Sequence, residues 1–202
     1  MSIFIIAEAG VNHNGSTDLA RKLIDAAVIA GADAIKFQTF KAENLVSKRA
    51  KKAQYQINAS KPSESQFEMI RKLELSAHSH KELNSYAIRN GIMFLSSPFD
   101  HESIDLLKEL DLSTFKIPSG EITNLPYLRY IGKLQKKIIL SSGMSSLKEV
   151  GAAIKVLVEN GTKKKNITVL HANSMYPTPM IDVNLKAMLT IQKEFNVAVG
   201  YS

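Results

Sequence analysis

The segment Thr114-Phe-Lys-Ile-Pro-Ser-Gly-Glu-Ile-Thr-Asn-Leu-Pro126 shows how this chain is built. Its first four residues are apolar or β-branched apart from one lysine, which predicts a short strand, and the proline and glycine that follow predict a turn. Lys116, Ser119 and Glu121 therefore lie together at the carboxyl end of a strand. An ammonium, a hydroxyl and a carboxylate in one place can hold an anion and move a proton. The same arrangement recurs along the sequence, and this recurrence predicts the fold.

Apolar strands alternate with amphipathic helices along the whole sequence. The predicted strands are residues 3–9, 34–39, 92–97, 114–117, 137–142, 167–172 and 197–201. The predicted helices are residues 19–30, 65–75, 78–89, 102–110, 128–134, 147–160 and 185–195. Strands separated by helices at this spacing pair in parallel. The connection 41–64 is too long for an ordinary turn, and we interpret it as a candidate functional loop.

Seven parallel strands fit either an open doubly wound sheet or most of a (β/α)8 barrel. No strand is followed by a G-x-G-x-x-G motif, which argues against a dinucleotide-binding sheet. Polar residues at nearly every strand end favour the barrel, because its active site draws on many strands at one rim. We predict an α/β (β/α)8 TIM barrel, truncated after the seventh strand, that forms one domain over residues 1–202. The last helix, strand and closing helix are then missing, and 202 residues fall short of the roughly 250 typical of the fold.

Composition limits the classes of protein that this chain can belong to. It contains no cysteine, which excludes disulfides and thiolate metal sites and makes a reducing cytoplasm the expected compartment. The net charge is +7, but the basic clusters are short and far apart, so we expect no nucleic-acid partner. No apolar run is long enough to span a bilayer, and we expect no membrane partner. The apolar start, residues 2–7, predicts a first strand rather than a signal peptide.

Polar side chains end the predicted strands. They are Glu8, Lys36, Gln38, Ser96, Ser97, Lys116, Ser119, Glu121, Ser141, Ser142, His171, Asn173, Ser174 and Ser202. Hydroxyls and ammonium groups that converge on one point form a phosphate pocket without a P-loop. Taken singly, each serine fits a turn or cap equally well, and each lysine fits an internal ion pair with Glu8 or Glu121. The two glutamates are the candidates for acid–base chemistry.

The histidines show no metal-ligand spacing, so the sequence predicts no metal site of its own. His13, in the first loop, either touches substrate or stabilises the loop with a hydrogen bond. His171 fits a structural position beneath the rim, and Tyr176 either binds a substrate hydroxyl or packs against its own loop. Three histidines are expected to be solvated: His78, His80 and His101.

Seven segments in order carry a resemblance to a known family. They are Ile6-Ala-Glu-Ala-Gly-Val-Asn-His-Asn-Gly15, Lys36-Phe-Gln-Thr39, Ser96-Ser-Pro-Phe99, Phe115-Lys-Ile-Pro-Ser-Gly-Glu121, Ile139-Leu-Ser-Ser-Gly-Met144, Tyr176-Pro-Thr-Pro179 and Val199-Gly-Tyr-Ser202. On these motifs the chain resembles the sialic acid synthase family, the N-acetylneuraminate synthases. The resemblance implies a (β/α)8 barrel that condenses phosphoenolpyruvate with an N-acetylmannosamine-type sugar, while a divalent metal, manganese or magnesium, polarises the sugar aldehyde.

The resemblance also assigns roles by motif. The residues implied in phosphoenolpyruvate binding are Lys36, Ser97, Lys116, Ser119, Ser141, Ser174 and Ser202. The residues implied in sugar binding are Glu8, Gln38, Glu121 and Tyr176. The residues implied in catalysis are Glu8, Glu121 and Lys36.

The chain departs from the family pattern in three places. Ser97 stands where many relatives have threonine, and residues 171–176 differ from the usual His-Cys-Thr form. In the family an Asp-His pair follows Gly-Tyr-Ser, so the metal ligands are expected beyond Ser202. A C-terminal antifreeze-like domain, which reaches across a homodimer, is also expected beyond this point.

Three alternatives stay open. A legionaminic acid synthase shares the motifs, and we expect the 41–64 connection to select the sugar; a pseudaminic acid synthase is disfavoured by the Val11-Asn-His-Asn-Gly15 loop. The chain could also be a non-catalytic remnant that only binds phosphate ligands. An aldolase of another barrel family would instead use a Schiff-base lysine.

Overall fold

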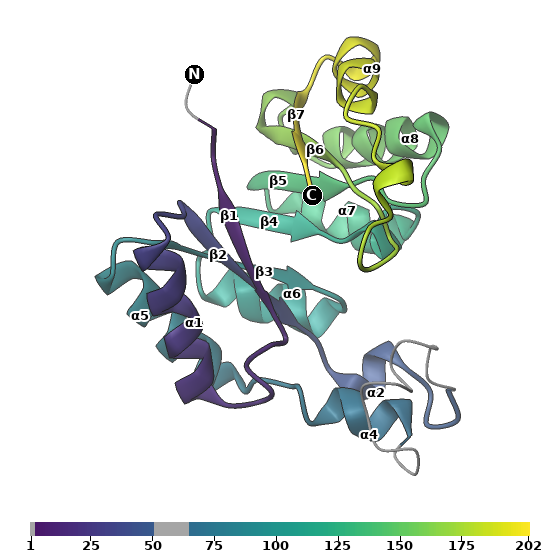
Figure 1. Cartoon of the computed structure of the whole chain (residues 1–202). Helices are drawn as coiled ribbons and strands as arrows, with labels where there is room; N and C mark the ends of the chain where they lie inside the picture. Colours follow the sequence, from purple (N-terminus) through teal and green to yellow (C-terminus); the bar gives the residue numbers. More distant parts are fainter. Residues whose placement is uncertain (1–2, 51–64) are drawn as a thin grey trace. The chain divides into compact units, whose positions relative to one another are not determined.

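The computed structural model describes residues 3–50 and 65–202 (Figure 1). These residues divide into two compact units, Met1–Leu112 and Ser113–Ser202. We call them unit 1 and unit 2.

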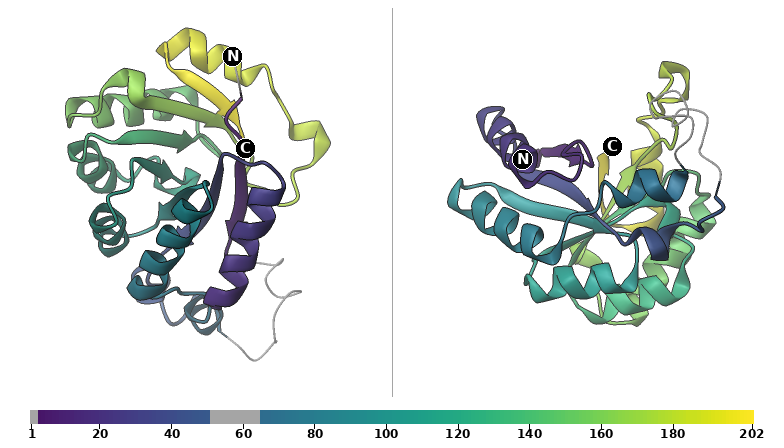
Figure 2. Two further views of the ribbon diagram at one scale, coloured as in Figure 1. Left: turned by 90° about the vertical axis from the view of Figure 1, so that its left-hand side faces the viewer. Right: turned by 90° about the horizontal axis from the view of Figure 1, so that it is seen from below.

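Unit 1 contains a three-stranded parallel sheet with the order β1-β2-β3. Its strands are β1 (Ile6–Gly10), β2 (Ala34–Thr39) and β3 (Met93–Pro98), and its helices are α1 (Thr17–Ile29), α2 (Ala42–Leu45), α4 (Gln66–Arg71), α5 (Ala77–Arg89) and α6 (His101–Glu109). Helices α1 and α5 lie side by side (Figure 2). They cover one face of the sheet, where the Phe37 and Phe94 rings stack with their centroids 5.4 Å apart. This face forms the core of the unit.

Unit 2 contains a four-stranded parallel sheet with the order β4-β5-β6-β7. Its strands are β4 (Thr114–Ile117), β5 (Lys137–Ser141), β6 (Ile167–His171) and β7 (Ala198–Tyr201), its α-helices are α7 (Leu125–Lys133), α8 (Leu147–Glu159) and α9 (Ala187–Phe195), and its 3-10 turns are η1 (Ser119–Glu121), η2 (Lys164–Asn166) and η3 (Met180–Asp182). Helices α7 and α8 pack against each other. Buried Gly132 allows their close approach, since a Cβ atom at this position would lie only 2.8 Å from the Cβ atom of Asn160.

The predicted α/β chain with parallel strands is confirmed, and most helices and strands begin and end within three residues of their predicted limits. The predicted helix 65–75 is an exception, because α4 ends at Arg71. The first strand begins at Ile6 rather than at residue 3. Its partner β2 begins at Ala34, which pairs with Ile6 and whose N–H donates to the Ile5 carbonyl oxygen at 3.2 Å, so no residue of β2 is left to pair with residues 3 and 4.

The sheets of the described residues do not close into a barrel. The 41–64 connection begins with the short helix α2, and its residues 51–64 lie outside the described part of the chain. Across the described residues, none of the helices has the length and apolar character that crossing a membrane requires.

Candidate functional site

Glu8 and Lys36 form the centre of the polar group in unit 1. They lie opposite each other in the β1–β2 register, and Lys36 Nζ is 2.6 Å from Glu8 Oε2. The lysine side chain is 13% exposed, whereas the glutamate side chain is 52% exposed. The internal ion pair that the sequence left open is therefore present, and it compensates the cost of placing an ammonium on the sheet. The carboxylate still reaches solvent, so it can also meet a substrate.

Gln38 and Ser97 extend this group along the same face of the sheet. They are register partners in β2 and β3, and strand alternation places Gln38 on the face of Lys36. Gly10, at φ +54°, leaves the space beside the Glu8 and Gln38 side chains open, since a Cβ atom on Gly10 would lie 3.2 Å from Glu8 Oε1 and 3.8 Å from Gln38 Nε2. The sequence predicted that Lys36 and Gln38 share a face, and the structure confirms it.

Lys116 is the central residue of the polar group in unit 2. It is only 5% exposed, and its Nζ donates to Ser141 Oγ at 2.7 Å and to the Ile117 carbonyl oxygen at 3.0 Å. Register places Lys116 opposite Ile139 on β5, two residues before Ser141, so both polar side chains use the same face. An ammonium and a hydroxyl are thus held in contact at the carboxyl ends of β4 and β5.

Ser119 is fixed by a backbone contact from the next strand–helix loop. Its Oγ accepts a hydrogen bond from the Gly143 N–H at 3.0 Å. A Cβ atom on Gly143 would lie 2.8 Å from that oxygen, so only glycine allows this approach. With its oxygen held in this way, the hydroxyl keeps its proton available for a ligand. Glu121 follows in the same turn, where its Oε2 accepts from Asn124 Nδ2 at 2.7 Å.

The remaining predicted residues lie in exposed positions. Ser174 and Tyr176 belong to the loop after β6, and the tyrosine is 78% exposed. Ser202 is exposed as well, and its N–H donates to the His171 carbonyl oxygen at 2.9 Å. The structure brings together Glu8, Lys36, Gln38 and Ser97 in unit 1, and Lys116, Ser119 and Ser141 in unit 2, but it leaves the loop residues Ser174 and Tyr176 outside both groups.

The prediction for His80 was wrong. Its side chain is buried, with 1% exposure, because it lies on the inner face of α5 at helical spacing with Leu83 and Ala87. That spacing was visible in the sequence and could have identified it. His78, two residues earlier and therefore on the opposite face of the helix, is exposed as predicted.

His13 is fully buried and stabilises its own loop. Its Nδ1 accepts from the Gly15 N–H at 3.0 Å, which is one of the two roles that the sequence left open. Burial, assisted by the nearby His80, lowers the pKa of His13 to about 4. The ring is therefore neutral at pH 7, and it carries its proton on Nε2.

A cavity of about 500 Å³ lies on the helix side of unit 2. It is lined by residues of α8, α9 and the β5–α8 loop, together with His171 and Asn184. The backbone N–H of Asn184 donates to His171 Nε2 at 3.4 Å, so the histidine supports the loop after β6. No motif in the sequence predicted this cavity.

The described residues hold no cluster of three or more histidine, aspartate or glutamate side chains that could bind a metal ion. The metal that the family resemblance implies therefore does not fit the residues described, and we assign it no ligands.

Parallel strands that end in ammonium, hydroxyl and carboxylate groups place this chain in the TIM-barrel-like α/β class. Residues 23–202 match the NeuB family, and the chain belongs to this family. It is 58% identical over 198 residues to the N,N'-diacetyllegionaminic acid synthase of Campylobacter jejuni, covering 98% of this chain and 59% of that protein. It is 48% identical over 204 residues to the enzyme of the same name from Legionella pneumophila, covering 100% and 57%.

A solved structure supports the same assignment. The N-acetylneuraminic acid synthetase of Leptospira borgpetersenii, crystallised with citrate, superposes with a TM-score of 0.86 at 30% identity and covers 100% of this chain. The match covers 65% of that structure, so the chain spans less than two thirds of the length of each of these relatives.

Proposed function

We propose that this chain contributes the substrate-binding strand ends of a synthase that condenses phosphoenolpyruvate with a 2-acetamido hexose to give a nonulosonic acid and phosphate. The observation that carries the proposal is buried Lys116, whose ammonium contacts the Ser141 hydroxyl at a strand end. A buried ammonium among hydroxyls is suited to a multiply charged anion such as phosphoenolpyruvate. Membership of the NeuB family points to the same chemistry.

Two sets of side chains are proposed to bind phosphoenolpyruvate. Lys116, Ser119 and Ser141 supply one ammonium and two hydroxyls from unit 2. Lys36 and Ser97 supply a further ammonium and hydroxyl from unit 1. We propose that two exposed serines, Ser174 and Ser202, make further contacts with the phosphate.

Glu8 and Glu121 are the proposed proton-transfer groups. In the reaction, the enol carbon of phosphoenolpyruvate forms a bond to the sugar aldehyde carbon, and the aldehyde oxygen takes up a proton to become a hydroxyl. Water then adds to the cationic carbon and loses one proton to a carboxylate, which balances the proton taken up by the aldehyde oxygen. Cleavage of the bond between that carbon and the phosphate oxygen leaves a ketone, and the departing phosphate takes the remaining hydroxyl proton. Glu8 is half-exposed and held by Lys36, which suits a carboxylate that must reach a substrate. We propose that Gln38 and Tyr176 contact the sugar.

The identity of the sugar substrate is a separate part of the proposal. N-acetylmannosamine is one candidate. The printed names of the 58% and 48% identical relatives favour an acetamido sugar that yields N,N'-diacetyllegionaminic acid instead. We also propose, from the family resemblance, that residues 1–202 form one synthase barrel domain and that the protein is a homodimer. The cytoplasmic location is proposed from the absence of cysteine.

The test measures phosphate release from phosphoenolpyruvate with a panel of acetamido hexoses, with manganese or magnesium present. We expect release that depends on one of these sugars and that falls at least tenfold in Lys116→Met, because the variant removes the buried ammonium. Lys133→Met, which changes an exposed lysine of α7, serves as the matched control. Binding of phosphoenolpyruvate without turnover would support the non-catalytic alternative. A covalent adduct trapped by borohydride with pyruvate would indicate an aldolase and overturn the proposal.

A further inference from the structure

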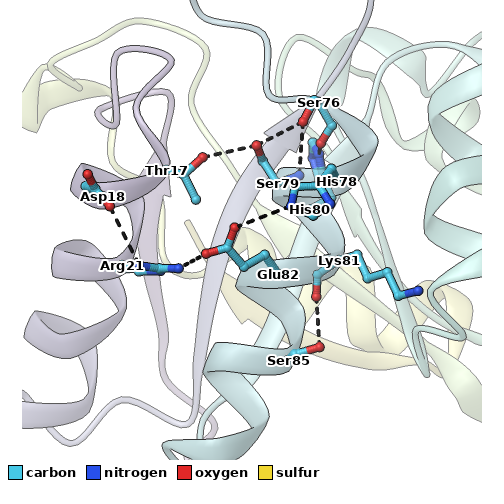
Figure 3. Close-up of polar contacts among 10 residues, drawn as sticks. All are labelled: Thr17, Asp18, Arg21, Ser76, His78, Ser79, His80, Lys81, Glu82 and Ser85. Atoms are coloured by element: carbon cyan, nitrogen blue, oxygen red, sulfur yellow. Dashed lines mark hydrogen bonds and ion pairs between the residues drawn. The ribbon is translucent and has the colours of Figure 1, made fainter.

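A buried chain of hydrogen bonds connects the first turn of α5 to the ends of two strands. Figure 3 shows Ser76 and His80 at the start of this helix. The His80 Nδ1 atom is 3.0 Å from the Ser76 carbonyl oxygen, and its Nε2 atom is 2.8 Å from Thr39 Oγ1. Thr39 Oγ1 in turn is 2.6 Å from Ser96 Oγ. The side chains of His80, Thr39 and Ser96 are all at most 3% exposed.

Every proton in this chain has one allowed position. A carbonyl oxygen only accepts, so His80 must carry its proton on Nδ1 to donate to Ser76. Burial lowers the pKa of His80, so the ring is neutral near pH 7 and its Nε2 is an acceptor. The Thr39 hydroxyl must then donate to Nε2, and the Ser96 hydroxyl must donate to Thr39 Oγ1. The chain is therefore directional and fully satisfied, which is the condition under which a buried polar network makes its surroundings rigid.

Aromatic packing fixes the histidine ring in this position. The Phe94 ring meets His80 edge to face, with centroids 6.5 Å apart and planes at 83°. Phe94 itself stacks on Phe37 of the neighbouring strand. The N-terminus of α5 is also held, since Ser76 Oγ accepts from the Ser79 N–H at 3.0 Å and Thr17 of α1 donates to Ser79 Oγ at 3.0 Å (Figure 3).

Thr39 and Ser96 are each adjacent in the sequence to a residue of the candidate site. Gln38 directly precedes Thr39, Ser97 directly follows Ser96, and these two residues are partners in the β2–β3 register. Because successive side chains of a strand point to opposite faces of the sheet, the side chains of Gln38 and Ser97 lie on the face opposite the hydrogen-bonded chain. A tie between the Thr39 and Ser96 side chains on the helix side therefore fixes the backbone from which the two site residues extend.

We propose that His80 is a positioning residue, which acts through Thr39 and Ser96 to hold Gln38 and Ser97 in the geometry that binds substrate. The assignment of these two residues to substrate rests on the proposed function. The hydrogen-bonded tie itself does not, so the two ideas can be tested separately.

The experiment compares Thr39→Val with Thr39→Ser in the full chain. Valine keeps the shape but removes the hydroxyl, so His80 Nε2 loses its donor and the Ser96 hydroxyl loses its acceptor. We expect Thr39→Val to raise the KM for phosphoenolpyruvate or for the sugar by roughly tenfold, because small displacements of binding groups carry large kinetic costs. Thr39→Ser restores the hydroxyl and should stay close to the wild-type KM.

A third variant separates positioning from general loss of stability. Ile24→Val trims a fully buried side chain of α1 without removing a hydrogen bond. It should leave the KM values and the backbone amide signals of Gln38 and Ser97 unchanged, whereas Thr39→Val should shift those signals. The ¹⁵N spectrum of wild-type His80 should show a protonated Nδ1 and an unprotonated Nε2.

Three outcomes decide the matter. Kinetic and amide changes in Thr39→Val alone support the positioning role. Equal behaviour of Thr39→Val and Ile24→Val, or a proton on His80 Nε2, overturns it. If the wild-type chain turns over no acetamido sugar, the proposed function loses its support, and the amide signals of Gln38 and Ser97 in the two variants still decide whether the tie exists.

Discussion

Acidification should destabilise unit 1 through His13. The ring is fully buried, and its pKa is lowered from the ordinary 6.5 to about 4, first by burial and then by His80. Below about pH 6.5 the unfolded chain takes up a proton that the folded chain excludes, so stability falls as the pH decreases. Between about pH 7 and pH 5 this single group should cost about 2 kcal/mol, and the loss should reach about 3 kcal/mol below pH 4.

The assay is urea-induced unfolding at a series of pH values, followed by the exchange protection of β2 amides. The His13→Asn variant offers the Gly15 N–H an amide oxygen but cannot titrate, so its unfolding free energy should show a shallower pH dependence. His80 acts in the same direction, because burial lowers its pKa too, and some slope should therefore remain. His78→Asn, at an exposed position of α5, is the control. An unchanged pH dependence in His13→Asn would refute the reasoning.

Three further variants probe close contacts and charge. Gly132→Ala should destabilise unit 2 by about 1–2 kcal/mol in urea unfolding, because overpacking outweighs the gain in helix propensity. The added Cβ atom would lie 2.8 Å from Asn160 Cβ at the end of α8. An unchanged unfolding midpoint would contradict this. Gly143→Ala should weaken phosphoenolpyruvate binding in calorimetry, since its Cβ would lie 2.8 Å from Ser119 Oγ, while Gly120→Ala, with open space around its Cβ, should bind as the wild type does. Lys36→Met should lower turnover far more than stability, because an ion pair whose carboxylate is half-exposed contributes at most about 1 kcal/mol. A large loss of stability with full turnover would show that the lysine is only structural.

The sequence predicted the local parts of this protein well. Apolar β-branched runs, N-cap serines and glycine stops depend on neighbouring residues, so strands and helices could be assigned from them, as at Ser146 before α8. The period of two along a strand placed Lys36 and Gln38 on one face and Phe37 on the other, as the structure confirms. The motifs at the strand ends also predicted membership of the family that residues 23–202 match.

The pairings across the sheets were decided only by the tertiary structure. The sequence allowed Lys36 or Lys116 to pair with either glutamate; the strand register sets Lys36 against Glu8, while Lys116 contacts Ser141. The β2–β3 register likewise sets Thr39 close enough to Ser96 for their hydroxyls to bond, with a buried His80 as the third member. Local propensity depends on a few adjacent residues, whereas these contacts join residues 25 to 57 positions apart, and no pattern along the chain encodes their register.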